Sequence, residues 1–140
     1  MTLNQELIRA RCQEIEESLE RLERIRKKTK ETFLSERDTQ DIASYRLLTA
    51  IEACLNLCYH VSAKRLKRVP EEYAECFVIL ADAGIIPQDL SERLQKTARF
   101  RNMLVHMYMY WKIDYAAVYD ILQTGLDDLR RFSAIIAGLV

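Results

Sequence analysis

Residues 47–61 read LLTAIEACLNLCYHV, an almost wholly apolar run. Upstream of this run lies Asp38, whose carboxylate can cap the free amides of a helix start, so we expect a helix from about residue 38 to about residue 64. A helix with so few polar side chains should lie at the centre of the molecule. The rest of the fold is therefore expected to pack around this segment.

The composition of the chain also favours helices. It has 140 residues, 49% of them hydrophobic, which is enough for the core of one domain spanning residues 1–140. Only three glycines and two prolines occur, so a sheet built on tight turns is disfavoured. We therefore predict an all-α fold.

Helical spacing of apolar residues and helix-ending residues divide the chain further. A long amphipathic helix is expected near the N-terminus and should end near Phe33, and a last helix should open at Asp114. Together with the central helix, this gives an up-and-down bundle of about five helices, with approximate ranges 3–33, 38–64, 70–83, 88–108 and 114–132.

Charge and hydropathy limit where the chain acts. Its 21 basic and 21 acidic residues cancel, so no global field would draw the protein onto nucleic acid or anionic lipid, and any RNA contact must be local. Arg93, Lys96, Arg99 and the basic residues of 64–68 could make such contacts, or could simply solvate helix surfaces. No signal-peptide pattern or membrane-spanning run is present, so we expect a cytoplasmic protein without membrane contact.

The central helix carries one polar stripe. Thr49, Glu52, Asn56 and His60 follow each other at steps of three or four residues and therefore lie on one side of the helix. This stripe is either the solvent edge of the helix or one wall of a cleft.

The octet Arg101–Tyr108 places an arginine inside an apolar stripe. On a helix Arg101 shares a face with Leu104, Val105 and Tyr108, where its charge needs a partner. Glu52 on the central helix is the candidate partner. An ion pair of this kind could also serve packing alone.

His106 points elsewhere on the same helix. It lies about 140° from Arg101, so the two side chains cannot converge on a straight helix. Either the helix ends near His106 and the chain turns it back, or a second copy completes the site. Phe100, Met103 and Met107 form a further apolar face suited to a dimer contact, and we therefore expect a homodimer with composite sites.

Metal and disulfide chemistry are not expected. The four cysteines, Cys12, Cys54, Cys58 and Cys76, fall within predicted helices and should be reduced core residues. His60 and His106 follow neither the zinc-finger nor the HExxH spacing. We predict no metal site and no cofactor.

The octet and its surroundings resemble a known family. Arg101, four residues, His106, one residue and Tyr108 match the RX4HXY signature of HEPN-domain toxins of the HepT type, with Asn102 after the arginine as is frequent there. The Val105-His106 pair, the helix opened by Asp114, and residues 50–55 leading to His60 are also similar. Most of the chain is covered by this resemblance.

The resemblance implies a toxin of a type II toxin-antitoxin system that cleaves RNA, such as a tRNA or an mRNA, without a metal. RNA carries its own nucleophile, the 2′-OH, so the enzyme needs only to move protons and stabilise the phosphorane. His106 would be the acid or base, Arg101 would hold the phosphate, and Asn102 and Glu52 would support them. The partner would be an MNT-type nucleotidyltransferase antitoxin that attaches AMP to Tyr108.

Two other functions remain open on the sequence. The chain could be a non-catalytic helical module that binds a nucleotidyltransferase or its substrate. It could also be a purely structural helical dimer in which Arg101 is a buried member of an ion pair. Substitution of Arg101 and His106 separates these alternatives from a nuclease.

Overall fold

The computed structural model describes residues 2–110 and 112–140, which form seven α-helices and no strand. The all-α prediction is thereby confirmed. The helices are α1 (Gln5–Arg26), α2 (Lys30–Ser35), α3 (Arg37–Arg65), α4 (Tyr73–Asp82), α5 (Gln88–Met109), α6 (Tyr115–Thr124) and α7 (Leu126–Ala137).

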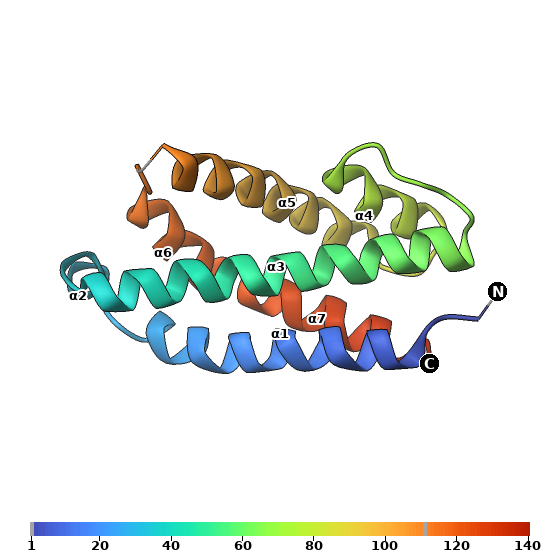
Figure 1. Ribbon diagram of the computed structural model, residues 1–140, viewed down its shortest axis with the longest axis horizontal. Helices are drawn as coiled ribbons and strands as arrows, with labels where there is room; N and C mark the ends of the chain where they lie inside the picture. The colour runs from blue at the N-terminus through green and yellow to red at the C-terminus, as the bar shows by residue number, and fades with distance from the viewer. Residues whose placement is uncertain (1, 111) are drawn as a thin grey trace.

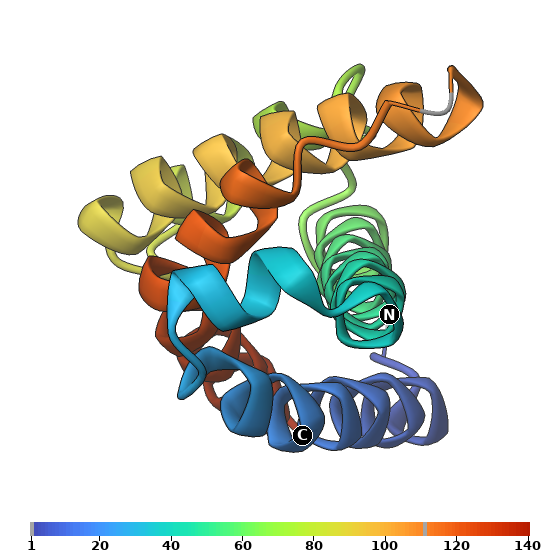
Figure 2. The same cartoon turned by 90° about the vertical axis from the view of Figure 1, so that its left-hand side faces the viewer.

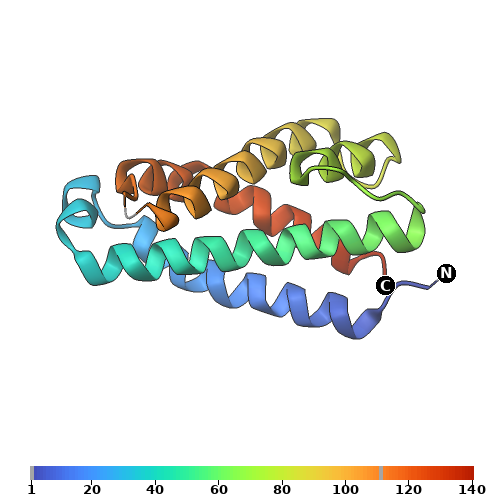
Figure 3. The same cartoon turned by 45° about the horizontal axis from the view of Figure 1, so that its top comes forward.

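The long helices alternate in direction. In Figure 1, α3 runs the length of the molecule between α1 on one side and α5 on the other, and both chain ends lie at the same end of the bundle. The view along the bundle in Figure 2 shows α1, α3, α5 and α7 arranged around a shared interior, with the short α2 crossing one end. Figure 3 shows that α4 lies alongside the first part of α5.

The central position predicted for residues 47–61 is confirmed. Side chains of α3 face the core on several sides, and within residues 47–61 those that are at most 2% exposed are Leu47, Ala50, Ile51, Cys54, Leu55, Leu57, Cys58 and Val61. The core is completed by aromatic rings from other helices, such as Phe77 of α4 and Phe132 of α7, whose centroids lie 5.4 Å apart. Apolar burial of this kind is the main stabilising contribution to a helical bundle.

The prediction of five helices was wrong at both ends of the chain. The first expected helix stops at Arg26, because Thr29 caps a separate short helix by accepting a hydrogen bond from the backbone N–H of Thr32 at 3.2 Å. Phe33 belongs to this short helix, and its ring packs into the core, where it is fully buried. A local capping signal thus interrupts a continuous amphipathic pattern.

The last expected helix is divided at Gly125. Asp114 does cap its start, accepting from the backbone N–H of Ala117 at 3.1 Å, but α6 ends at Thr124 and α7 begins at Leu126. A Cβ at position 125 would lie 3.0 Å from the carbonyl oxygen of Ile121, so a glycine suits this close approach.

Three of the four cysteines lie in the core as predicted, whereas Cys12 is only partly buried. The four cysteines are free, and Cys54, Cys58 and Cys76 are buried in the core, where burial raises the pKa of the Cys54 thiol well above its ordinary value. No helix among the described residues combines the length and the apolarity that crossing a bilayer requires.

Candidate active site

The octet Arg101–Tyr108 lies in the last two turns of α5. Four fully buried apolar side chains, Leu90, Leu94, Ala98 and Leu104, turn one face of this helix toward the core. Arg101 lies on the same side and therefore meets α3, as the helical spacing predicts.

The guanidinium of Arg101 is held by three neighbours. Its Nε donates to Glu52 of α3 in an ion pair, and Nη1 donates to the side-chain oxygen of Asn102 at 3.2 Å. The guanidinium carbon also lies 4.6 Å from the centre of the Tyr73 ring of α4, within the range of a cation–π contact. The side chain is 19% exposed, so these contacts hold the guanidinium in place while part of the side chain still reaches the surface.

His106 occupies a different face of α5. Its side chain is exposed, and its ring lies 4.6 Å from the ring of Tyr110, centroid to centroid. Among residues 2–110 and 112–140, no hydrogen bond or ion pair joins His106 to Arg101. The helix continues past His106 to Met109, so the chain does not turn the imidazole back toward the arginine.

Tyr108 faces α3 at the same end of the helix. Its side chain is 38% exposed, and burial of the remainder raises the pKa of the phenol, with the charge of Asp41 adding to the rise and the Ser44 hydroxyl opposing it. At neutral pH Tyr108 is therefore an accessible, uncharged phenol.

Three residues of the polar stripe line a cleft. Thr49, Glu52 and Asn56 border a pocket of about 380 Å³ together with Arg11 and Glu14 of α1. The Nε of Arg11 donates to the side-chain oxygen of Asn56 at 3.1 Å.

His60, the fourth residue of the stripe, has another task. Its Nε2 accepts a hydrogen bond from the backbone N–H of Asn4 at 2.9 Å, which ties the start of α1 to the far end of α3. The first three residues of the stripe thus form a wall of the cleft, and the fourth, His60, makes a structural contact.

The apolar face expected to make a dimer contact is smaller than predicted. Phe100 is 7% exposed because it belongs to the core, and it cannot serve such a contact. Met103 remains 47% exposed, and Met109 and Tyr110 at the end of α5 are also exposed.

Tyr73 is the site residue that sequence reasoning missed. It belongs to α4, far from the octet in sequence, and no local spacing links it to Arg101. Only the path of residues 66–72, which returns the chain alongside α5, brings its ring against the guanidinium.

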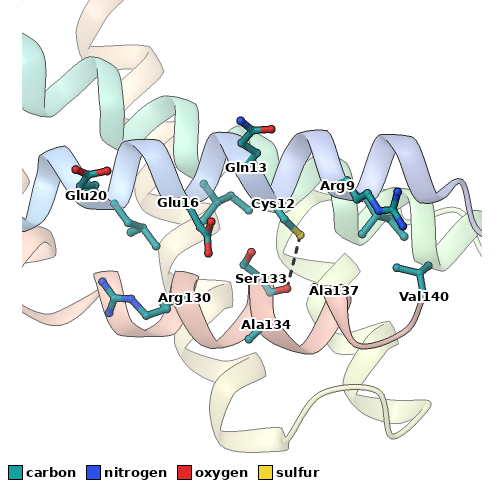
Figure 4. Close-up of a pocket in the computed structure, with 13 residues that line it drawn as sticks. Arg9, Cys12, Gln13, Glu16, Glu20, Arg130, Ser133, Ala134, Ala137 and Val140 are labelled. Atoms are coloured by element: carbon teal, nitrogen blue, oxygen red, sulfur yellow. Dashed lines mark hydrogen bonds between the residues drawn. The ribbon is translucent and has the colours of Figure 1, made fainter.

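A larger hollow lies away from these residues. It has a volume of about 940 Å³ and runs between α1 and α7, where Figure 4 shows the small side chains Cys12, Ser133 and Ala134 between charged residues at its rim. The Cys12 thiol donates to the carbonyl oxygen of Ser133 at 3.7 Å across it. In the described residues, no three His, Cys, Asp or Glu side chains gather as a metal site would require.

A family model and a curated relative both point to the same protein family. The model of a family described as ribonuclease HepT-like matches residues 15–136. The mRNA nuclease HepT of Shewanella oneidensis is 30% identical over 97 residues, which cover 69% of this chain and 71% of that protein.

Solved structures share the fold. One is a tri-AMPylated HEPN toxin of Shewanella oneidensis in complex with an MNT antitoxin, with a TM-score of 0.82, 24% identity, and coverage of 94% of this chain and 97% of that chain. Another is the cytosolic protein of unknown function YutE from Bacillus subtilis, with a TM-score of 0.83, 18% identity, and coverage of 98% and 90%.

Proposed function

The chain belongs to the HepT-like ribonuclease family, and from this membership we propose that it is a toxin that cleaves RNA without a metal and is silenced by a nucleotidyltransferase antitoxin. The observation that carries the proposal is the state of Arg101. Its guanidinium is held by Glu52, Asn102 and Tyr73 while part of the side chain still reaches the surface, and an exposed imidazole follows on the next turn.

Arg101 is suited to a phosphate. A guanidinium presents several N–H donors in a fixed plane, and a partly desolvated one binds an oxyanion more strongly than a solvated one. Because Arg101 is already oriented before substrate arrives, little reorganisation is needed as negative charge builds on the phosphorane.

The reaction can be written with the groups at hand. The ribose 2′-OH loses its proton to an imidazole, its oxygen attacks the adjacent phosphorus, and the bond from phosphorus to the 5′-oxygen breaks. A protonated imidazole gives its proton to that 5′-oxygen, leaving a 2′,3′-cyclic phosphate and a 5′-OH. His106 is exposed and can reach such an RNA.

A second copy of the chain would complete the site. Arg101 and His106 lie on different faces of a helix that does not bend, so one copy offers only half of the groups to a given phosphate. We infer a homodimer formed near the exposed end of α5, in which the His106 of one protomer serves the Arg101 of its partner. Met103, Met109 and Tyr110 supply exposed apolar surface for it.

Tyr108 is the proposed point of control. Its phenol oxygen would attack the α-phosphorus of ATP, release pyrophosphate and become AMP-modified, with its proton passing to a base of the nucleotidyltransferase. Since the pKa of Tyr108 is raised, the tyrosine does not ionise by itself and depends on that base. The added phosphate would lie at the same end of α5 as His106 and repel the RNA backbone.

The proposed nuclease activity is tested with purified protein and a mixed RNA substrate in EDTA. We expect cleavage by the wild type, and a rate lowered by about 10²–10⁴-fold in His106→Ala and by about 10²–10³-fold in Arg101→Ala. The matched control is His60→Gln, which alters the other histidine of the chain and should keep near-normal activity. Full cleavage by both alanine variants would instead favour a non-catalytic binding module.

The proposed silencing of the toxin by AMP attachment is tested by measuring the intact mass of the protein. Incubation with the cognate nucleotidyltransferase and ATP should add the mass of AMP to the wild type and abolish cleavage, whereas Tyr108→Phe should neither gain that mass nor be silenced. Tyr110→Phe, two residues on and 63% exposed, is the control that should still be modified. Modification of Tyr108→Phe to the wild-type extent would place the AMP elsewhere.

A further inference from the structure

A third pocket borders Tyr73 and Asn102, two of the residues that hold Arg101. It has a volume of about 470 Å³, lies between the start of α4 and the middle of α5, and is lined by Glu71, Glu72, Tyr73, Ala74, Arg99 and Asn102. Asn102 and Tyr73 position Arg101. The other four residues have no role in the chemistry described above.

The pocket shares two side chains with the surroundings of the Arg101 guanidinium. Asn102 both lines it and accepts from Nη1 of Arg101 at 3.2 Å. Tyr73 also lines it and lies 4.6 Å from the Arg101 guanidinium carbon. A group in this pocket would therefore contact the same two side chains that hold the Arg101 guanidinium.

The charged side chains of the pocket are available for a ligand. Glu71, Glu72 and Arg99 are exposed, and among the described residues none of them forms an ion pair. Two carboxylates repel a phosphate, so this pocket suits an uncharged group that offers hydrogen-bond donors to the glutamates. Arg99 adds donors for acceptor atoms on the same group.

Guanine has this arrangement of donors and acceptors. Its N1–H and N2–H2 groups form a donor pair that a carboxylate accepts, and its O6 and N7 form an acceptor pair that arginine reads. Adenine and cytosine each present an acceptor where guanine presents N1–H, and uracil lacks the amino group. The Tyr73 ring and Ala74 supply an apolar wall for the face or edge of a base.

We propose that this pocket binds a guanine base of the RNA next to the phosphate held by Arg101, and so sets the sequence preference of cleavage. This inference rests on the proposed nuclease function. Glu71 and Glu72 read the donor edge of the base, and Arg99 reads its acceptor edge.

The first measurement does not depend on cleavage. Calorimetry compares the binding of guanosine, inosine and adenosine 5′-monophosphates to the purified protein, since all three carry the same phosphate and differ only in the base. The guanine nucleotide should bind about tenfold or more tightly than the adenine nucleotide, with inosine between them because it lacks only the N2 amino group. The Glu71→Gln/Glu72→Gln double variant should lose this preference, whereas Glu17→Gln, an exposed glutamate of α1, should keep it.

The second measurement maps cleavage sites in a random-sequence RNA. The wild type should enrich guanine at one position beside the cut, and the double variant should reduce that enrichment several-fold while still cutting. Equal binding of the three nucleotides, or a guanine preference unchanged in the double variant, would overturn the inference. A wild type that prefers the guanine nucleotide but cuts no RNA would refute the nuclease proposal and leave the pocket assignment standing.

Discussion

The solvent exposure of the Arg101–Glu52 ion pair distinguishes a functional arginine from a purely structural one. A fully buried ion pair costs about 3–5 kcal/mol when one partner is removed, because the other charge is left without solvent. Glu52, however, is 44% exposed in its side chain, so water can replace the guanidinium. The ion pair therefore costs little to break.

We predict that Arg101→Ala lowers the free energy of unfolding by only about 1–2 kcal/mol, the sum of a partly exposed ion pair and the packing of the arginine stem. Urea denaturation followed by circular dichroism measures it. Arg24→Ala, which removes an arginine 72% exposed in its side chain, is the control and should change stability by less than about 0.5 kcal/mol. A loss above about 3 kcal/mol for Arg101→Ala would support the structural-dimer alternative.

At the scale of elements, the start of α1 depends on a histidine of α3. Asn4 caps α1 through its side-chain oxygen, which accepts from the backbone N–H of Leu7 at 3.1 Å, and its own backbone N–H is held by Nε2 of His60. The nitrogen can accept that bond only while it is unprotonated. Partial burial, and the charge of Lys64 to a smaller extent, lower the pKa of His60, which agrees with a neutral ring in the folded protein.

This contact makes part of the stability dependent on pH. Because the folded state lowers the pKa of His60, the unfolded chain takes up the proton first as the pH falls below about 6.5. The contribution of the His60 contact to the free energy of unfolding is thus complete above that pH and is lost progressively below it. We expect the thermal midpoint of the wild type to fall by roughly 2–4 °C more than that of His60→Gln between pH 7.5 and pH 5.5. Parallel curves for the two proteins would contradict this role.

The elements themselves were predictable to different degrees. The bounds of α3 and α5 lie close to the predicted ones, since a buried helix carries a strong periodic pattern and α5 begins directly after Pro87. The breaks after Arg26 and at Gly125 were missed because the apolar pattern continues across them, and only a cap and a close backbone approach interrupt the helix.

The site was predictable where helical geometry alone decides it. The pairing of Arg101 with Glu52 and the divergence of Arg101 from His106 both follow from residue spacing on helices. Tyr73 and the pocket beside it were not predictable, because their position depends on how residues 66–72 return the chain to α5.

For the whole molecule, the balance of charge limits how RNA can bind. With no net charge, binding must rely on local contacts. Not every basic residue named from the sequence is free for this purpose. Arg93 is paired with Asp128 at 2.8 Å and with Asp89 at 3.1 Å, and these contacts, that with Asp128 first, raise its pKa. Arg99, beside the proposed base pocket, is exposed and forms no such pair in the described part of the chain.

The composite site makes a prediction that belongs only to the assembled dimer. If Arg101 of one protomer works with His106 of its partner, a mixed dimer of Arg101→Ala and His106→Ala protomers contains one site with both alanines and one site with both native residues. After subunit exchange at equal concentration, half of the dimers are mixed and one of their two sites is intact, so about a quarter of wild-type activity should return. Each variant alone should stay inactive, and a mixture that also stays inactive would show that both groups come from one chain or that both histidines serve every site.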